Sequence, residues 1–376
     1  MHVLVAPDKF AGTLTATEAA QAIRTGWLRH RPDDTVSIAP MSDGGPGFVD
    51  ALHASLGGSL HAITVDGPLG QPTPAALLLV PGEEGSTAYV ESAQACGLAL
   101  LPRSPGARTP DVDVAERAST AGVGQLVGAA VDAGARTVVI GLGGSGTNDG
   151  GAGLLAALGA TVEPAGALEQ GAMALGSISV VDVDPARARV GQCRLVAASD
   201  VTNPLLGLRG ATNVYGPQKG LSKERLFAVD GALSAFAHLV DRDAADTPGA
   251  GAAGGLGYAL TVLGAEHRPG LDLVADASGL DDRLAAADLV LTGEGALDPQ
   301  TFTGKVVQGV AQRAAGRGVA CVALAGRVEV GSRELRAAGI DGAYGVVDVV
   351  GEDEAFERPA DALAGLAQRV ARTWGR

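Results

Sequence analysis

The sequence from Thr137 to Leu158, TVVIGLGGSGTNDGGAGLLAAL, determines the fold class that we expect for this chain. It opens with a β-branched run, 137–140, which predicts a buried strand, and it closes with an apolar run, 154–158, which predicts a helix. Seven of the thirteen residues from Gly141 to Gly153 are glycine. A strand, a glycine-rich loop and a helix in succession are typical of an α/β protein whose loop amides bind an anion.

Residues 141–153, the glycine loop, also contain hydroxyl, amide and carboxylate groups that suit a phosphate, a polyol or a magnesium shell. Glycine permits positive φ and lets a ligand approach the backbone, so we interpret these glycines as serving a ligand rather than packing. The candidate cofactor-binding residues of the loop are Gly143, Gly144, Ser145, Thr147 and Asn148. The alternative is a flexible turn with a helix N-cap at Asn148 or Asp149.

Length and composition set the limits of the interpretation. A chain of 376 residues predicts two domains, and 46% hydrophobic residues with only 3% aromatic residues predict a core of Ala, Val and Leu. The net charge of −14 and the lack of a basic block argue against nucleic-acid and anionic-membrane partners. Three scattered cysteines, no signal peptide and no apolar stretch of membrane-spanning length lead us to expect a cytoplasmic protein.

The N-terminal part of the chain predicts two further strands that end in polar residues. A strand over 2–6 is followed by Asp8 and Lys9, and a strand over 35–39 is followed by Asp43 in a Ser-Asp-Gly-Gly turn. Open α/β sheets bind ligands at the carboxyl ends of their strands, so these residues are candidates for a site. Inert turns, with Asp43 as a helix cap, are the alternative.

The distribution of lysine gives a second indication. Lysine occurs only at positions 9, 219, 223 and 305, whereas arginine takes the other 24 basic positions. Where lysine persists in such a chain, a compact ammonium group is a plausible requirement. Lys9, Lys219 and Lys305 all stand in glycine-flanked motifs, while Lys223 stands at an ordinary helix start that we expect at the surface.

Two strand ends in the second half of the chain concentrate polar side chains. A strand over 195–198 leads to Asp200 and Asn203, which could orient a hydroxyl group or form an Asx turn before Pro204. A strand over 287–292 leads to residues 293–305, which include Gly293, Glu294, Asp298 and Lys305, and a helix over 306–315 follows. The loop departs from a Walker A sequence because Pro299 and Val306 stand where Gly and Ser or Thr belong.

The order of these elements predicts two domains. From about residue 63, short strands joined by Gly/Pro turns indicate antiparallel or mixed pairing. Further strands are expected over 318–325 and 345–350, with a last helix over 361–374. We expect a three-layer α/β domain assembled from residues 1–62 and 283–376, an inserted α/β domain of mixed sheet over 63–282, and an active site in the cleft between them.

Taken together, the motifs resemble the bacterial two-domain glycerate kinase family over nearly the whole chain. They occur in the family's order: DKFAGTLTA, SDGGPG, GLGGSGTNDGGAG, ASDVTNP, GPQKG, GAAGGLG and GEGALDPQTFTGK. The resemblance implies a flavodoxin-like domain with a second α/β domain, and ATP-dependent phosphorylation of D-glycerate, commonly at the 2-hydroxyl. The chain departs from the family where Ala11, Pro46, Phe48 and Ala296 replace Lys, Glu, Thr and Arg, and Lys9 could replace the missing lysine.

Phosphoryl transfer needs charge neutralisation, in-line placement and a positioned acceptor hydroxyl. On that chemistry we assign Asp200, Asp298, Lys9 and Lys305 as candidate catalytic residues, with Asp200 as the leading base. Gly293 and Glu294 join the glycine loop as candidate cofactor-binding residues for ATP. The candidate substrate-binding residues are Asp8, Asp43, Asn203 and Lys219, and the candidate Mg²⁺ ligands are Asp298 and Asp43. Lys9, Arg209 and Arg327 are candidates for the glycerate carboxylate.

Three alternatives remain open on the sequence. Gly141-x-Gly143-x-x-Gly146 satisfies a dinucleotide fingerprint and Glu163 follows at a suitable distance, so the chain could be an NAD(P)-dependent oxidoreductase. A two-domain protein that binds a sugar acid without catalysis is the second, and phosphorylation at the 3-hydroxyl is the third. The expected partners are D-glycerate and ATP, with a homodimer left open.

Overall fold

A computed structural model describes residues 1–10, 12–302 and 305–375. The chain divides into two compact units: unit 1 contains Met1–Asp43, Asp50–Gly57 and Leu271–Arg376, and unit 2 contains Gly44–Val49 and Gly58–Gly270. We expected boundaries after residue 62 and before residue 283, whereas residues 58–62 belong to unit 2 and residues 271–282 belong to unit 1. The segment Gly44–Val49, however, belongs to unit 2, although it lies within the stretch expected in the first domain.

Unit 1 is built on a five-stranded sheet in which all strands are parallel. In spatial order the strands are β2 (Thr35–Ile38), β1 (His2–Val5), β11 (Leu289–Leu297), β12 (Ala320–Val328) and β13 (Gly342–Gly345). Numbered along the chain within the unit, this order is 2-1-3-4-5, the flavodoxin-like order. The expected flavodoxin-like domain is therefore confirmed, and its strand order reverses between β1 and β11.

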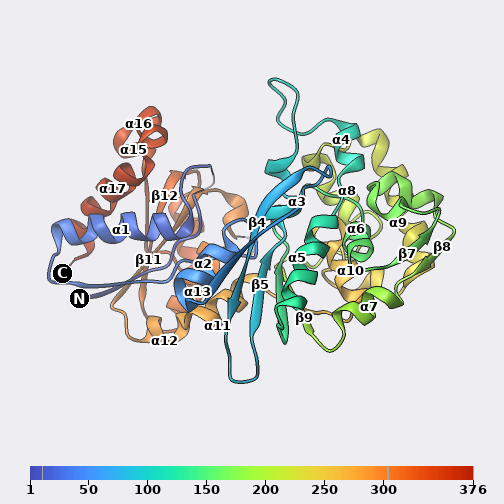
Figure 1. Cartoon of the computed structure of the whole chain (residues 1–376). Helices are drawn as coiled ribbons and strands as arrows, with labels where there is room; N and C mark the ends of the chain where they lie inside the picture. The colour runs from blue at the N-terminus through green and yellow to red at the C-terminus, as the bar shows by residue number, and fades with distance from the viewer. Residues whose placement is uncertain (11, 303–304, 376) are drawn as a thin grey trace. The chain divides into compact units, whose positions relative to one another are not determined.

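Helices cover both faces of this sheet. Helices α1 (Ala16–His30) and α17 (Pro359–Trp374) lie side by side and share a core with alternate strand residues such as Val3, Val5 and Leu289 (Figure 1). Alternation follows because successive strand side chains point to opposite faces. On the other face, α13 (Val306–Ala315) contacts β11 and β12. Unit 1 thus has the three layers that the sequence predicts.

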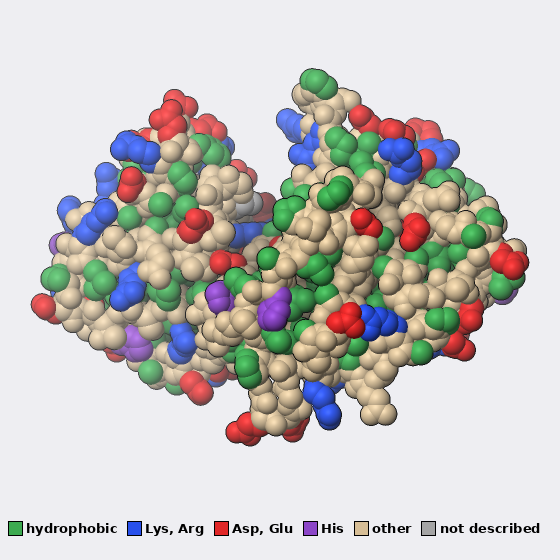
Figure 2. Space-filling view, in the orientation of Figure 1, with side chains coloured by type: hydrophobic (Ala, Val, Ile, Leu, Met, Phe, Trp, Pro, Cys, Tyr) green, Lys and Arg blue, Asp and Glu red, His purple; other side chains and the backbone are tan. Residues whose placement is uncertain are grey.

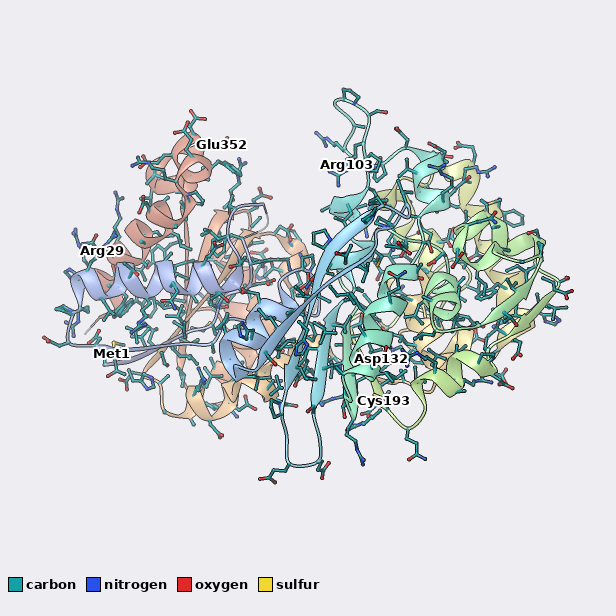
Figure 3. All side chains as sticks on the ribbon, viewed as in Figure 1. Met1, Arg29, Arg103, Asp132, Cys193 and Glu352 are labelled. Atoms are coloured by element: carbon teal, nitrogen blue, oxygen red, sulfur yellow. The ribbon has the colours of Figure 1, made fainter. Side chains whose placement is uncertain are left out.

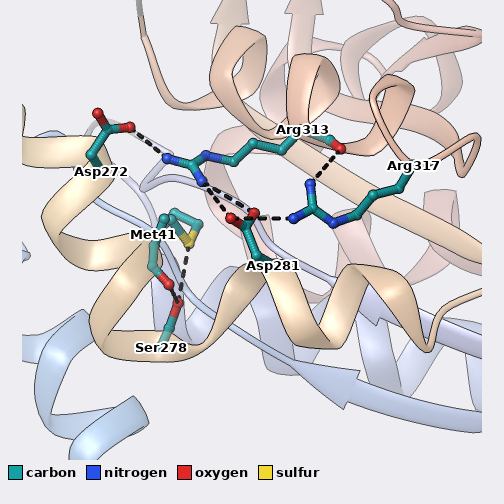
Figure 4. A network of polar contacts seen from close by, with 7 residues as sticks. Met41, Asp272, Ser278, Asp281, Arg313 and Arg317 are labelled. Atoms are coloured by element: carbon teal, nitrogen blue, oxygen red, sulfur yellow. Dashed lines mark hydrogen bonds and ion pairs between the residues drawn. The ribbon is translucent and has the colours of Figure 1, made fainter.

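An ion-pair network joins α13 to two other helices of unit 1 (Figure 4). Arg313 of α13 pairs with Asp272 of α11 (Gly270–Ser278) at 2.5 Å and with Asp281 of α12 (Leu280–Ala285) at 3.1 Å. Arg317 adds a second contact to Asp281 at 3.3 Å. Partly exposed pairs contribute at most about 1 kcal/mol each, so the network fixes the positions of the helices more than it stabilises the unit.

Unit 2 contains a six-stranded mixed sheet. In spatial order its strands are β10 (Glu266–Arg268), β9 (Arg194–Ala198), β6 (Thr137–Gly141), β5 (Thr87–Glu91), β4 (Pro72–Val80) and β3 (Ser59–Asp66). The first four are parallel, and β4 is antiparallel to both β5 and β3. The mixed sheet that we expected after residue 62 is confirmed. A separate antiparallel pair joins β7 (Thr161–Glu163) to β8 (Val180–Asp182).

The buried residues are mostly Ala, Val and Leu, as the composition predicts, and further helices complete the two units. They are α2 (Phe48–Leu56), α3 (Ala93–Cys96), α4 (Val112–Arg117), α5 (Ala121–Asp132), α6 (Ala152–Ala157), α7 (Asp184–Val190), α8 (Ala211–Tyr215), α9 (Lys223–Val240), α10 (Leu256–Val262), α14 (Ser332–Ala337), α15 (Val347–Val350) and α16 (Glu352–Glu357). Of the helices described, none is long and apolar enough to cross a membrane. On the face drawn in Figure 2, basic and acidic side chains are interspersed.

Two predictions of secondary structure are corrected. The expected strand over 345–350 is wrong, because β13 ends at Gly345 and residues 347–350 form helix α15. The strand expected to end at residue 292 continues to Leu297, because β11 keeps its pairing with β12 as far as Leu297 and Val328. Gly293 permits this close pairing, since a Cβ there would lie 1.9 Å from the Leu324 carbonyl oxygen. Glu294 therefore lies on a strand and not on a loop.

The close packing of α1 on α17 can be tested by substitution of a glycine in each helix. A Cβ at Gly26 would lie 2.0 Å from the Ala364 carbonyl oxygen, whereas a Cβ at Gly365 of α17 would meet no atom within 4 Å. Gly26→Ala should lower the free energy of unfolding by about 1–3 kcal/mol. The matched control Gly365→Ala should raise it by about 0.5–1 kcal/mol, because alanine favours the helix. Urea unfolding followed by circular dichroism measures both, and equal effects of the two substitutions would contradict the packing described.

Candidate functional site

A cavity of about 410 Å³ lies in unit 1 at the carboxyl ends of the sheet strands. It is lined by residues that follow β1, by the end of β11 and by the end of β12. The strand order reverses between β1 and β11. Open α/β sheets bind ligands in the crevice at this point of reversal, so the fold itself places the cavity where a ligand is expected.

One side of the cavity brings together three residues predicted from the sequence. The Lys9 amide donates to Asp8 Oδ1 at 2.7 Å, and the Lys9 ammonium nitrogen lies 3.7 Å from Asp8 Oδ1 and 4.0 Å from Asp43 Oδ1. Asp8 is 7% exposed. Burial raises the pKa of Asp8 to about 7, although the Lys9 charge opposes this shift. A carboxylate that titrates near neutral pH in a cavity is suited to proton transfer.

A second set of residues comes from β11 and the turn after it. The Thr301 hydroxyl donates to Glu294 Oε1 at 2.7 Å and accepts from the Asp298 amide at 3.1 Å, while the Thr301 amide donates to Asp298 Oδ1 at 3.2 Å. Burial raises the pKa of Glu294. Thr301 is fully buried, so it positions both carboxylates without being exposed itself. The sequence showed this threonine beside the acidic residues, but its buried position could not be read from the spacing.

Basic residues complete the polar part of the cavity. Lys305 lies at the start of α13, and Arg327 lies near the end of β12. Arg327 is the register neighbour of Ala296, and both residues line the cavity. A guanidinium group is therefore present beside the position where the family resemblance led us to expect an arginine. Ala11, the other position where the family has a basic residue, lies outside the described residues.

The polar residues of the cavity fit a magnesium–phosphate complex better than a metal bound by protein alone. Four carboxylates, those of Asp8, Asp43, Glu294 and Asp298, line it together with Lys9, Lys305 and Arg327. Within the described ranges, no three His, Cys, Asp or Glu side chains are grouped closely enough to hold a metal ion. Magnesium commonly takes only one or two carboxylates and completes its shell with water and phosphate oxygens, so this donor set is compatible with it.

Sequence analysis missed the apolar part of the cavity. It is formed mainly by segment 346–363, with Val346, Val347, Ala355, Phe356, Pro359 and Leu363 among the lining residues, and Phe10 and Leu14 add to it. These residues belong to separate elements and share no motif, so only the folded chain brings them together. They give the cavity an apolar part and a polar part.

The glycine loop of unit 2 is packed against protein. A Cβ at Gly143 would lie 2.5 Å from Gly45 Cα, and a Cβ at Gly144 would lie 2.6 Å from Pro46 Cδ. The Gly143 amide also donates to the Gly44 carbonyl oxygen at 3.0 Å. Our interpretation that these glycines do not serve packing is therefore wrong at both positions. The same contacts explain why Gly44–Val49 belongs to unit 2.

Buried polar groups hold the rest of the loop. Asp149 is fully buried and accepts from the Thr120 amide and hydroxyl, both at 2.8 Å, as well as from two loop amides. Lys219 is 3% exposed and donates to Ser145 Oγ at 2.9 Å and to the Thr147 carbonyl oxygen at 2.8 Å. Burial lowers the pKa of Lys219 to about 8. Lys219, predicted to bind substrate, thus lies inside unit 2 and supports the loop.

The other predicted residues of unit 2 have different environments. Asn203 donates to the Arg209 carbonyl oxygen at 2.7 Å and accepts from the Tyr215 hydroxyl at 2.8 Å, so its side chain holds the chain after β9. Asn148 is buried, and its Oδ1 finds no hydrogen-bond partner among the described residues. Asp200 is exposed just after β9.

The geometry removes the support for a dinucleotide fingerprint. Such a fingerprint packs its third glycine against the helix that starts there. A Cβ at Gly146 would instead meet Leu98 and Leu101, and α6 begins only at Ala152. Glu163 is exposed on the small β7–β8 sheet, which is separate from the six-stranded sheet that contains β6.

The loop contacts predict a measurable loss of stability. Gly144 and Gly134 have nearly the same φ, 76° and 79°, but only Gly144 has protein atoms at its Cβ position. Gly134→Ala should cost about 1–2 kcal/mol of unfolding free energy from backbone strain alone. Gly144→Ala should cost about 1–3 kcal/mol more, because the methyl group meets Pro46. Denaturant unfolding of both variants tests this, and equal losses would show that the Pro46 contact is absent.

Comparisons with known proteins agree with the fold. A sequence model of the glycerate kinase family matches residues 3–375. The chain is 38% identical to a glycerate kinase of Bacillus subtilis (strain 168), over 99% of this chain and 97% of that protein. It is 37% identical to a glycerate 2-kinase of Escherichia coli (strain K12), over 99% of this chain and 98% of that protein. A crystal structure of a putative glycerate kinase 2 from Salmonella typhimurium LT2 superposes with a TM-score of 0.80 at 37% identity, covering 100% of this chain and 98% of that one. The chain therefore belongs to the glycerate kinase family.

Proposed function

We propose that the protein transfers a phosphoryl group from ATP to the 2-hydroxyl of D-glycerate. The observation that carries the proposal is the cavity of unit 1, where cationic and carboxylate side chains meet at the point of strand-order reversal. Phosphoryl transfer depends on placement and charge neutralisation more than on covalent participation by the protein. The name of the Escherichia coli relative, glycerate 2-kinase, supports the 2-hydroxyl as acceptor.

The cationic residues have a direct role in this proposal. Lys9 and Lys305 line the polar part of the cavity, and Arg327 also lines the cavity, with Glu352 as its ion-pair partner. Their charges would bind the phosphate oxygens of the donor. Asp43 and Asp298 would hold Mg²⁺, which neutralises phosphate charge when bound.

Asp8 is the better candidate for the base, although the sequence pointed first to Asp200. Asp8 is buried in the cavity, and its pKa of about 7 allows it to accept a proton near neutral pH. Asp200 is exposed in unit 2 and remains the second candidate. Lys219 and Asn203 act as positioning residues in this scheme because their polar atoms bond to protein groups. The glycine-loop residues Gly143 to Asn148 would then shape a binding surface through their fixed backbone.

The pH dependence of the reaction tests the base. Only ionised Asp8 can accept the proton, so kcat/KM should fall about tenfold per pH unit below pH 7 and level off above it. Asp8→Asn should lower kcat by about 10²–10⁴-fold. It should also remove the fall of kcat/KM at low pH, which is the acid limb of the pH profile. The assay measures ADP formation with D-glycerate, and NMR identifies the product as 2- or 3-phosphoglycerate.

The matched variant Asp200→Asn separates the two candidates. It should retain the acid limb of the wild type and lose activity less than Asp8→Asn. A loss confined to Asp200→Asn, with Asp8→Asn unaffected, would assign the base to Asp200. No ADP formation by the wild-type protein with ATP, Mg²⁺ and D-glycerate would refute the proposed function.

The magnesium requirement tests Asp298 separately. Removing a metal ligand weakens metal binding, and added metal restores it by mass action. Asp298→Asn should therefore raise the Mg²⁺ concentration needed for half-maximal rate about tenfold or more, with partial recovery of the rate at high Mg²⁺. Titration of the rate with Mg²⁺ measures this, with Asp200→Asn as the control. An unchanged Mg²⁺ requirement would exclude Asp298 as a ligand.

A further inference from the structure

The cavity of unit 1 has two chemically different parts, and only the polar part is used by the proposed transfer reaction. Segment 346–363 forms most of the apolar part, beyond the carboxyl ends of β12 and β13. D-Glycerate is a small molecule with a carboxylate and two hydroxyl groups, so it has no flat apolar surface that could pack against the apolar part of the cavity. A nucleotide has both an apolar aromatic base and charged phosphates.

Phe356 is the distinctive residue of the apolar part. Its side chain is 58% exposed and lines the cavity. Among the phenylalanine side chains that the structure describes, Phe10, Phe48 and Phe236 are buried, and only Phe227 in unit 2 shares the exposed state of Phe356. Exposing an aromatic ring to water forfeits the free energy that burial would release. A ring left exposed at the wall of a cavity is suited to stack on a ligand.

The structure also shows how the helix that carries Phe356 is held. Glu352, labelled in Figure 3, lies in the first turn of α16. It forms an ion pair with Arg327 near the end of β12. Glu352 and Phe356 are four residues apart, so they lie on the same face of the helix. The ion pair therefore turns the face with Phe356 toward the strand ends. Arg327 itself lines the cavity, so one residue joins its polar and apolar parts.

We propose that the base of the nucleoside triphosphate stacks on Phe356, with the triphosphate directed toward Lys9 and Lys305. This inference rests on the proposed function, and it adds that unit 1 contains the nucleotide site. The cavity volume of about 410 Å³ lies within the range of about 300–1,000 Å³ that is usual for small-molecule sites. Stacking is possible with any base, so Phe356 provides affinity for a base and the polar residues provide affinity for its phosphates.

Phe356→Ala tests the stacking, and Phe227→Ala is the matched control because both rings are exposed. Phe356→Ala should weaken Mg·ADP binding and raise KM for ATP by about 5- to 100-fold, since base–aromatic stacking is of that strength. Binding of inorganic tripolyphosphate, which has no base, should stay within about twofold of wild type. Phe227→Ala should match the wild type for both ligands. Calorimetric titration and steady-state kinetics give the values.

A second variant gives a direct signal from the site. Phe356→Trp preserves an aromatic surface, so it should retain Mg·ADP binding, and the new indole fluorescence should change as ADP saturates. Tripolyphosphate should not produce that change. Because Phe356 is exposed, neither variant should alter the circular dichroism spectrum.

The failures of the two proposals are distinguishable. If the wild type phosphorylates D-glycerate from ATP but Phe356→Ala leaves ADP affinity unchanged, the base binds elsewhere and the proposed function stands. If Phe356→Ala weakens ADP and tripolyphosphate equally, the residue shapes the site without stacking, and the inference is overturned. If the wild type neither binds ADP nor transfers phosphate from ATP, both proposals are overturned.

Discussion

The parallel pairing of β1 with β11 is the constraint on which the site in unit 1 depends. It places Val3 beside Leu289 and so joins the two ends of the chain in one sheet. Both strands then deliver their carboxyl ends to the same edge, because they run in the same direction. Asp8 and Glu294 meet there although they are far apart in sequence, and the rise in the pKa of Asp8 includes a contribution from Glu294.

The same constraint explains the unusual electrostatics of the cavity. Burial raises the pKa of Asp8 and destabilises its ionised form, and two nearby carboxylates add to the rise, while the Lys9 charge opposes it. Folded proteins tolerate such a cost mainly at functional sites, where a perturbed carboxylate is useful in catalysis. Unit 2 uses buried charges differently, because Asp149 accepts hydrogen bonds from Thr120 and from two loop amides, and Lys219 donates hydrogen bonds to the glycine loop. One unit thus presents its charged groups to a cavity, while the other uses them to fix a backbone.

The sequence predicted the strand-end residues Asp8, Lys9, Asp43 and Asp298 because a strand followed by a polar turn is a local pattern. It also predicted the two α/β units and the mixed sheet. It did not predict the contacts of Gly143 and Gly144 with Gly45 and Pro46, since a glycine needed for packing looks the same as a glycine needed for a ligand. Nor did it predict the apolar part of the cavity around Phe356. The residues of this part come together only through the arrangement of α16 and α17 at the strand ends.

Hydrogen exchange of the wild-type protein with and without Mg·ADP tests most directly whether the nucleotide binds in unit 1, at the point where the strand order reverses. Bound nucleotide should slow exchange of the amides that it covers or orders. We predict slower exchange in segments 7–10, 12–14 and 346–357, with no change over 143–149. Slower exchange confined to 143–149, with segments 7–10, 12–14 and 346–357 unchanged, would contradict this location of the nucleotide.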